Sequence, residues 1–227
     1  MERLFGKSTW RGLDRSSMGC APLGRAGDER NERGQSMAVF ACALSALLVC
    51  LALAFDFGIA NYERTRTLDM VKQAEEQCLL PSTSLAVKNS DNPGNEMCHA
   101  LVKYMRQLGY DGEIDAYYYE APSGSYGSNA TQRVYVFGMT VNAKTETLIG
   151  AVFDTHVIPT RVRSWSHAVA YSSTGAWRPV GAANGAILHI DAGSDGAATA
   201  PTYVSVATED TMPGVTGELK QAEIDAA

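Results

Sequence analysis

The longest apolar segment of the chain comprises residues 37–55, MAVFACALSALLVCLALAF, and contains no charged residue. At a helical rise of about 1.5 Å per residue, this segment covers close to 30 Å, the thickness of the hydrocarbon core of a bilayer. No other stretch of the sequence is long and apolar enough to cross a membrane. The pattern therefore predicts a single transmembrane helix, which we assign to residues 37–60.

Two other interpretations of this segment predict a processed chain. A cleaved secretory signal would use the small-x-small sequence at residues 52–54, but 36 residues precede the apolar segment, where such signals have a short basic leader. A lipoprotein signal would modify Cys50, which follows Val49 rather than a small residue. We favour a retained helix, because its length fits and no proline interrupts residues 56–78.

Helical periodicity continues beyond the apolar segment. The positions that recur at helical spacing are Leu68, Val71, Ala74 and Cys78. We therefore expect one helix of 44 residues from Met37 to Leu80, ended by Pro81. A second amphipathic helix should begin at Pro93, with Asn92 as its cap. Its apolar side would carry Met97, Leu101, Tyr104, Met105 and Leu108, with Cys98 at the edge.

From residue 111 onward the pattern changes to short runs rich in Tyr, Val, Thr and Ile, which indicate strands. The expected strands are Ile114–Glu120, Arg133–Val141, Thr147–Asp154, Thr160–Tyr171, Ala186–Asp191 and Tyr203–Thr208. Residues 142–146 separate the second strand from the third and predict a hairpin turn. We expect an α+β fold, in which an antiparallel sheet packs against the two helices.

These elements divide the chain into four parts. We expect a polar cytoplasmic tail over residues 1–36, the membrane helix over 37–60 and an extracytoplasmic α+β head over 61–208. The last nineteen residues, 209–227, hold five acidic residues against one lysine, and we expect them to be flexible.

The charge and the cysteine content of the chain limit the classes of function and of cellular compartment that fit the sequence. The net charge is −6, and because residues 1–34 carry +2, the remainder carries −8, which argues against a nucleic-acid partner. Cys78 and Cys98 are the two cysteines of the large C-terminal region. Outside the cytoplasm such a pair predicts a disulfide; the alternative is two buried free thiols.

The residues that usually carry catalysis or bind metals form no recognisable constellation in the sequence. The four histidines are dispersed, and three of them lie on or beside expected strands. A single Glu-x-x-His pair at residues 96–99 lacks the second motif of a di-iron site, and the calcium-like loop that begins at Asp191 has Thr202 in place of the final glutamate. We expect no enzyme activity, no metal and no cofactor.

The surroundings of the apolar segment resemble a known family. Glu32-Arg33-Gly34-Gln35-Ser36 precede the segment, and Asp56-Phe57-Gly58 and then Tyr62 follow it, before a charged amphipathic helix. This arrangement, over residues 32–78, resembles the N terminus of the TadE/TadG-like minor pseudopilins, which belong to the tight-adherence (Tad) pilus-assembly proteins. The resemblance implies a pilin-like head and a structural role in a Tad-type pilus, in a bacterial cell membrane with the N terminus in the cytoplasm.

The resemblance also implies roles for individual residues. Prepilin peptidase would cut between Gly34 and Gln35. The TadE-like members carry a glutamate five residues after that glycine, where this chain has Val39, so the chain is closer to the TadG-like members, which are implied to stay uncleaved. Independently of the resemblance, we expect Asp56, at the last turn of the span, either to lie at the membrane interface or to pair with a partner helix.

The expected partners follow from the same comparison. They are other pilus or pseudopilin subunits, the Tad assembly machinery and membrane lipid. The small side chains of the apolar segment would let neighbouring helices approach closely. The alternative function is a membrane-tethered adhesion or ligand-binding module that is unrelated to pili.

Overall fold

The computed structural model describes residues 28–129, 131–147, 156–171 and 184–226. The helices are α1 (Asp28–Leu79), α2 (Pro81–Asn89), α3 (Pro93–Gln107) and α4 (Val215–Asp225). The strands are β1 (Glu113–Glu120), β2 (Gln132–Glu146), β3 (Val157–Tyr171), β4 (Gly185–Ile190) and β5 (Thr202–Val204). Contacts between residues divide the described part of the chain into two units at residues 50 and 51, and the second unit holds the sheet. The predicted α+β class is confirmed.

The five strands form one sheet in the order β3-β2-β1-β4-β5, and every neighbouring pair is antiparallel. The sheet places β1 at its centre, between β2 and β4. Side chains alternate between the two faces of a strand, so each strand contributes to two separate layers.

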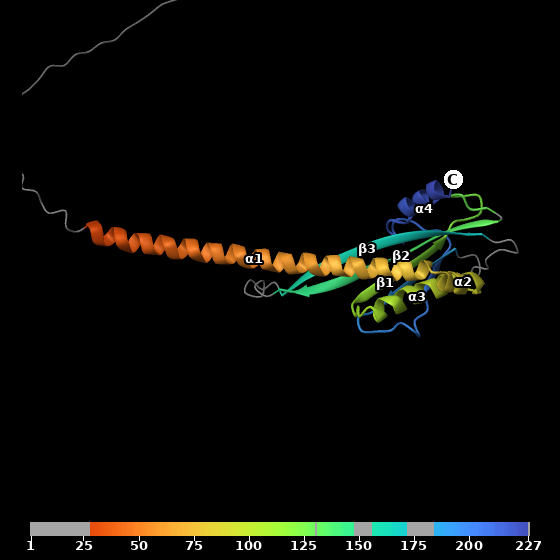
Figure 1. Cartoon of the computed structure of the whole chain (residues 1–227), viewed down its shortest axis with the longest axis horizontal. Helices are drawn as coiled ribbons and strands as arrows, with labels where there is room; N and C mark the ends of the chain where they lie inside the picture. Colours follow the sequence, from red (N-terminus) through yellow and green to blue (C-terminus); the bar gives the residue numbers. More distant parts are fainter. Residues whose placement is uncertain (1–27, 130, 148–155, 172–183, 227) are drawn as a thin grey trace, which may run out of the picture. The chain divides into compact units, whose positions relative to one another are not determined.

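Helices cover both faces of the sheet (Figure 1). On one face, residues of α1, α2 and α3 pack against alternate strand residues to form the larger core. On the other face, α4 packs against a smaller cluster that includes Tyr119, Val134 and Val136. The α1 residues in the larger core are Val71, Ala74 and Cys78, three of the four that the helical periodicity selects.

The expected second helix is confirmed as α3. Asn92 is its cap, and its side-chain oxygen accepts a hydrogen bond from the backbone N–H of Asn95 at 3.2 Å. Close packing explains why a glycine follows Pro93, because a Cβ at Gly94 would lie 2.8 Å from the Cβ of Ala186 on β4. The expected apolar side faces the sheet, with Met97, Leu101 and Met105 fully buried.

In the middle of the chain, one expectation is confirmed and another is wrong. Helix α1 ends at Leu79, just before Pro81, as expected. The sequence did not predict helix α2, which begins at once because proline at its first position lacks only an N–H that would have no helical partner. Residues 142–146 are not a turn: they belong to β2 and pair with residues 157–161 of β3. Most of the expected strand Thr147–Asp154 lies outside the described residues.

The expectations for both ends of the chain are also corrected. Helix α1 begins at Asp28, within the part expected to be a polar tail, whereas residues 1–27 lie outside the described residues. The acidic segment 209–227, expected to be flexible, contains α4. Its apolar residues Val215, Leu219 and Ala222 are buried against the sheet, and this burial provides the stabilisation that the local sequence does not reveal.

Candidate functional site

Two kinds of surface have functional potential: the apolar part of α1 and a polar face of the sheet. In α1, Ser36–Leu79 is long and apolar enough, by length and composition, to cross a membrane, which is consistent with a single-pass anchor. Gly34 and Gln35 lie within this helix, and Val39 is 64% exposed. Asp56 is 4% exposed, so its carboxylate is covered within the molecule and does not face outward at the end of the apolar segment.

The predicted Cys78–Cys98 disulfide is absent. Both residues are free, buried thiols, so the alternative interpretation is the correct one. The Cys98 thiol donates weak hydrogen bonds to the backbone carbonyls of Ala116 and Ala186, at 3.7 and 3.8 Å. Burial raises the pKa of Cys78 to about 12 and raises that of Cys98 as well, which keeps both residues as thiols rather than thiolates.

Helix α4 covers one end of the sheet face on which it packs, and polar side chains occupy the other end of that face. Directly paired residues on antiparallel strands point to the same face. The pairs His189–Asp115, Asp115–Thr140 and Thr140–Arg163 therefore form one row across β4, β1, β2 and β3. Because side chains alternate, Glu113 lies on this face beside Asp115, two residues earlier on β1.

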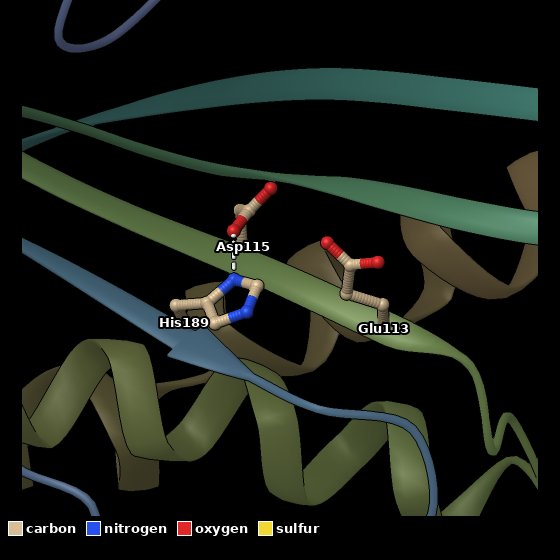
Figure 2. Close-up of side chains that lie close together, drawn as sticks. All are labelled: Glu113, Asp115 and His189. Carbon is tan, nitrogen blue, oxygen red and sulfur yellow. Dashed lines mark hydrogen bonds and ion pairs between the residues drawn. The ribbon is translucent and has the colours of Figure 1, made fainter.

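Glu113, Asp115 and His189, which we call the carboxylate–histidine cluster, converge on the face between β1 and β4 (Figure 2). His189 Nδ1 lies 2.6 Å from Asp115 Oδ1, and His189 Nε2 lies 3.5 Å from Asp191 Oδ1. One potential ligand atom from each of the three cluster residues lies within 4.8 Å of the other two. The hydrogen bond to Asp115 raises the pKa of His189, and the nearby carboxylates add to the effect.

Arg106 on α3 holds the chain segments on both sides of this cluster. Its guanidinium donates to the backbone carbonyls of Tyr110 at 2.6 Å and Gly112 at 2.9 Å, just before β1. It also donates to the carbonyls of Asp191 at 3.1 Å and Ser194 at 2.7 Å, just after β4. One side chain therefore ties the start of β1 to the end of β4, where the cluster lies.

A cleft of about 610 Å³ opens beside Glu113. Residues of α1, of the α3–β1 turn, of β2 and of the segment after β4 line it, and they include Tyr110, Glu113, Asn142 and Asp191. The buried Tyr110 hydroxyl has no hydrogen-bond partner among the described residues. Leaving such a group unsatisfied costs about 1–3 kcal/mol. Burial raises the pKa of Tyr110 to about 12, so the group stays a hydroxyl.

The sequence analysis did not find the carboxylate–histidine cluster. It treated each histidine separately and identified no partner for His189. The signal was nevertheless present. His189-x-Asp191 places two ligand-type side chains on one face of an expected strand, and Glu113-x-Asp115 would do so if the expected strand Ile114–Glu120 began one residue earlier. The pairing of β1 with β4, which are 65 residues apart in the chain from Glu120 to Gly185, was the missing information.

The chain matches no protein-family model, no curated protein and no solved structure. Functional conclusions therefore depend on the geometry described above and on the resemblance of the N-terminal segment.

Proposed function

We propose that the chain is a membrane-anchored structural protein of the bacterial envelope, a minor pseudopilin or assembly component of a Tad-type pilus. One observation carries the proposal. The large apolar side chains of α1 between residues 37 and 57 are exposed, whereas Val71, Ala74 and Cys78 of the same helix lie in the core of the head. An apolar surface of this extent needs lipid or neighbouring helices to cover it.

The sequence around the exposed segment supports the pilus part of the proposal. Residues 32–36 and 56–58 resemble the flanks of the apolar helix in TadE/TadG-like proteins. In this proposal the N terminus is cytoplasmic and the pilin-like head is extracytoplasmic. The helix contacts other pilus subunits and the assembly machinery, and the head is displayed outside the membrane.

A second candidate function is a tethered binding module that uses the helix as an anchor alone. The polar sheet face and the cleft beside Glu113 favour this candidate, because a ligand needs an exposed surface with convergent polar groups. The two functions differ in what they require of the apolar segment. A subunit needs a particular helix surface, whereas a tether needs hydrophobicity.

Reordering the apolar segment tests this difference. In a deletion strain of the native host, the gene is supplied either as wild type or with residues 38–54 reordered at constant composition, which preserves membrane insertion but moves the small residues. We expect the reordered protein to reach the membrane and yet to leave surface filaments at the level of the deletion strain. Filaments restored to the wild-type level, or a deletion that leaves them unchanged, would contradict the pilus function.

A further inference from the structure

We propose that Glu113, Asp115 and His189 form a binding site for a divalent transition-metal cation of the Zn²⁺ class at the open end of the sheet. The proposal concerns the head and does not depend on the membrane role of α1. It rests on the donor set and on the positions of the three side chains, which the pairing of β1 with β4 holds together.

The donor set fits the Zn²⁺ class. An imidazole nitrogen is a ligand that borderline metals such as zinc accept and that Ca²⁺ and Mg²⁺ rarely use, and carboxylate oxygens complete many zinc sites. Three protein ligands leave a fourth position of a tetrahedral ion open. In Figure 2 the carboxyl groups of Glu113 and Asp115 and the His189 ring approach one another from adjacent strands.

The geometry requires small movements. Two ligand atoms on one tetrahedral zinc ion lie roughly 3.3 Å apart, given bond lengths of about 2.0–2.2 Å. The ligand atoms of the cluster are already within 4.8 Å of one another, and the Asp115–His189 contact of 2.6 Å would have to open slightly. The His189 side chain is 54% exposed and therefore has room to rotate, whereas Asp115, at 19%, is held more firmly.

The surrounding structure holds the ligands in place before a cation binds. Asp115 and His189 are direct partners in the β1–β4 register, so their backbones are fixed relative to each other. Arg106 binds the backbone on both sides of the cluster, as described above. A bound cation would therefore not have to order a loop, and most of its binding energy would be retained.

Cobalt(II) is a suitable probe, because it occupies zinc sites and its absorption spectrum reports the ligands. The full-length protein, in detergent, is titrated with Co²⁺ and then with Zn²⁺. We expect one Co²⁺ per chain, with visible d–d bands but without the near-ultraviolet thiolate charge-transfer band, and with displacement by Zn²⁺. We expect Zn²⁺ also to raise the thermal unfolding temperature.

Matched variants assign the site. Glu113→Gln, Asp115→Asn and His189→Gln should each weaken Co²⁺ binding about tenfold or more. His99→Gln and Glu223→Gln, which lie on α3 and α4 away from the cluster, should bind as the wild type does. The backbone of Glu113 pairs with Asn142 of β2. The side chain of Glu113 makes no hydrogen bond or ion pair with the described residues, so Glu113→Gln tests the site with little risk to folding, and metal-free melting curves verify this.

Three results would overturn the proposal. One is the absence of stoichiometric binding by the wild type. Another is a thiolate band, which would assign the cation to the cysteines. The third is Co²⁺ affinity in Glu113→Gln and His189→Gln equal to that of His99→Gln, which would leave Asp115–His189 as an ordinary cross-strand ion pair.

Discussion

Glu75 on α1 is a carboxyl group buried between a helix and a strand. Its side chain is 3% exposed, and Oε2 accepts hydrogen bonds from the hydroxyls of Ser164 at 2.9 Å and Ser166 at 3.1 Å on β3. Its other oxygen has no partner among the described residues. Burial raises the pKa of Glu75 to about 7, although the two serine hydrogen bonds oppose the shift.

This raised pKa predicts a pH-dependent stability. Between pH 4.5 and 7 the folded chain keeps the Glu75 proton while the unfolded chain loses it, so stability falls as pH rises through this interval. The loss is complete above pH 7 and amounts to about 3 kcal/mol. We expect Glu75→Gln to match the wild type near pH 4 and to exceed its free energy of unfolding at pH 8, as measured by urea denaturation.

The neighbouring Glu76 provides the control, because its side chain is exposed on the same helix. Glu76→Gln should follow the wild-type pH profile. If the difference between Glu75→Gln and the wild type were the same at pH 4 and pH 8, the carboxyl group would not be titrating in this interval.

At the residue scale, the sequence predicted the structure correctly where neighbours along the chain determine the local conformation. Asn92 and Pro93 define the start of α3 through their own backbone preferences, and both were identified correctly. The prediction failed where contacts between residues distant in the sequence determine the structure. Cys78 is close enough to Cys98 to help raise its pKa, yet the hydrogen bonds of Cys98 go to strands β1 and β4, which the spacing of the two cysteines in the sequence could not reveal.

At the level of elements, α4 shows why a helix can be missed. Its first backbone N–H groups are capped from outside the helix: the Glu209 carboxylate accepts from Gly214 at 2.7 Å and from Thr216 at 3.2 Å. These hydrogen bonds lower the pKa of Glu209. A search for a local capping box finds nothing here, because the acidic residue lies before the helix rather than at its third position.

Helix α4 is also tied to the sheet through polar contacts. His167 on β3 lies between two carboxylates of α4, with Nδ1 2.7 Å from Glu218 Oε1 and Nε2 2.9 Å from Asp225 Oδ2. The indole N–H of Trp165 donates to the carbonyl of Pro213 at 3.0 Å. The ring of Trp165 stacks on Tyr117 with centroids 5.5 Å apart, so its fluorescence should report the docking of α4.

Truncation of a buried α4 side chain tests whether this helix belongs to the cooperative fold. Leu219 is buried against the sheet, so we expect Leu219→Ala to lower the free energy of unfolding by about 2–4 kcal/mol. Lys220→Ala, on the exposed side of the same helix, should change it by less than about 0.5 kcal/mol. Urea unfolding followed by Trp165 fluorescence and by circular dichroism measures both variants. Equal stability of Leu219→Ala and Lys220→Ala would mean that α4 is not docked.

On the scale of the whole molecule, the sequence predicted the class of fold but not its topology. Strand periodicity located β1, β2, β3 and β4. Most of the ends of these strands lie within a few residues of the expected positions, because alternating side chains are a local property. The order β3-β2-β1-β4-β5 depends on contacts between distant segments, which periodicity does not encode. The polar sheet face and its carboxylate–histidine cluster follow from that order, so they became visible only with the structure.

The apolar segment of α1 gives the last prediction, which concerns how the whole chain is held in a membrane. A lysine at the centre of a membrane helix costs about 2.5–3.5 kcal/mol on insertion scales. We expect the double substitution Leu47→Lys and Leu48→Lys to move the protein out of the carbonate-resistant membrane fraction of its native cells. Leu47→Ala and Leu48→Ala together, which shorten the same side chains without adding charge, should leave the protein in that fraction. N-terminal sequencing of the wild-type protein separates the two kinds of processing from a retained, uncleaved helix. Prepilin-type processing would give a chain that begins at Gln35. A cleaved secretory signal would release a chain that begins near Phe55, which would contradict a retained anchor.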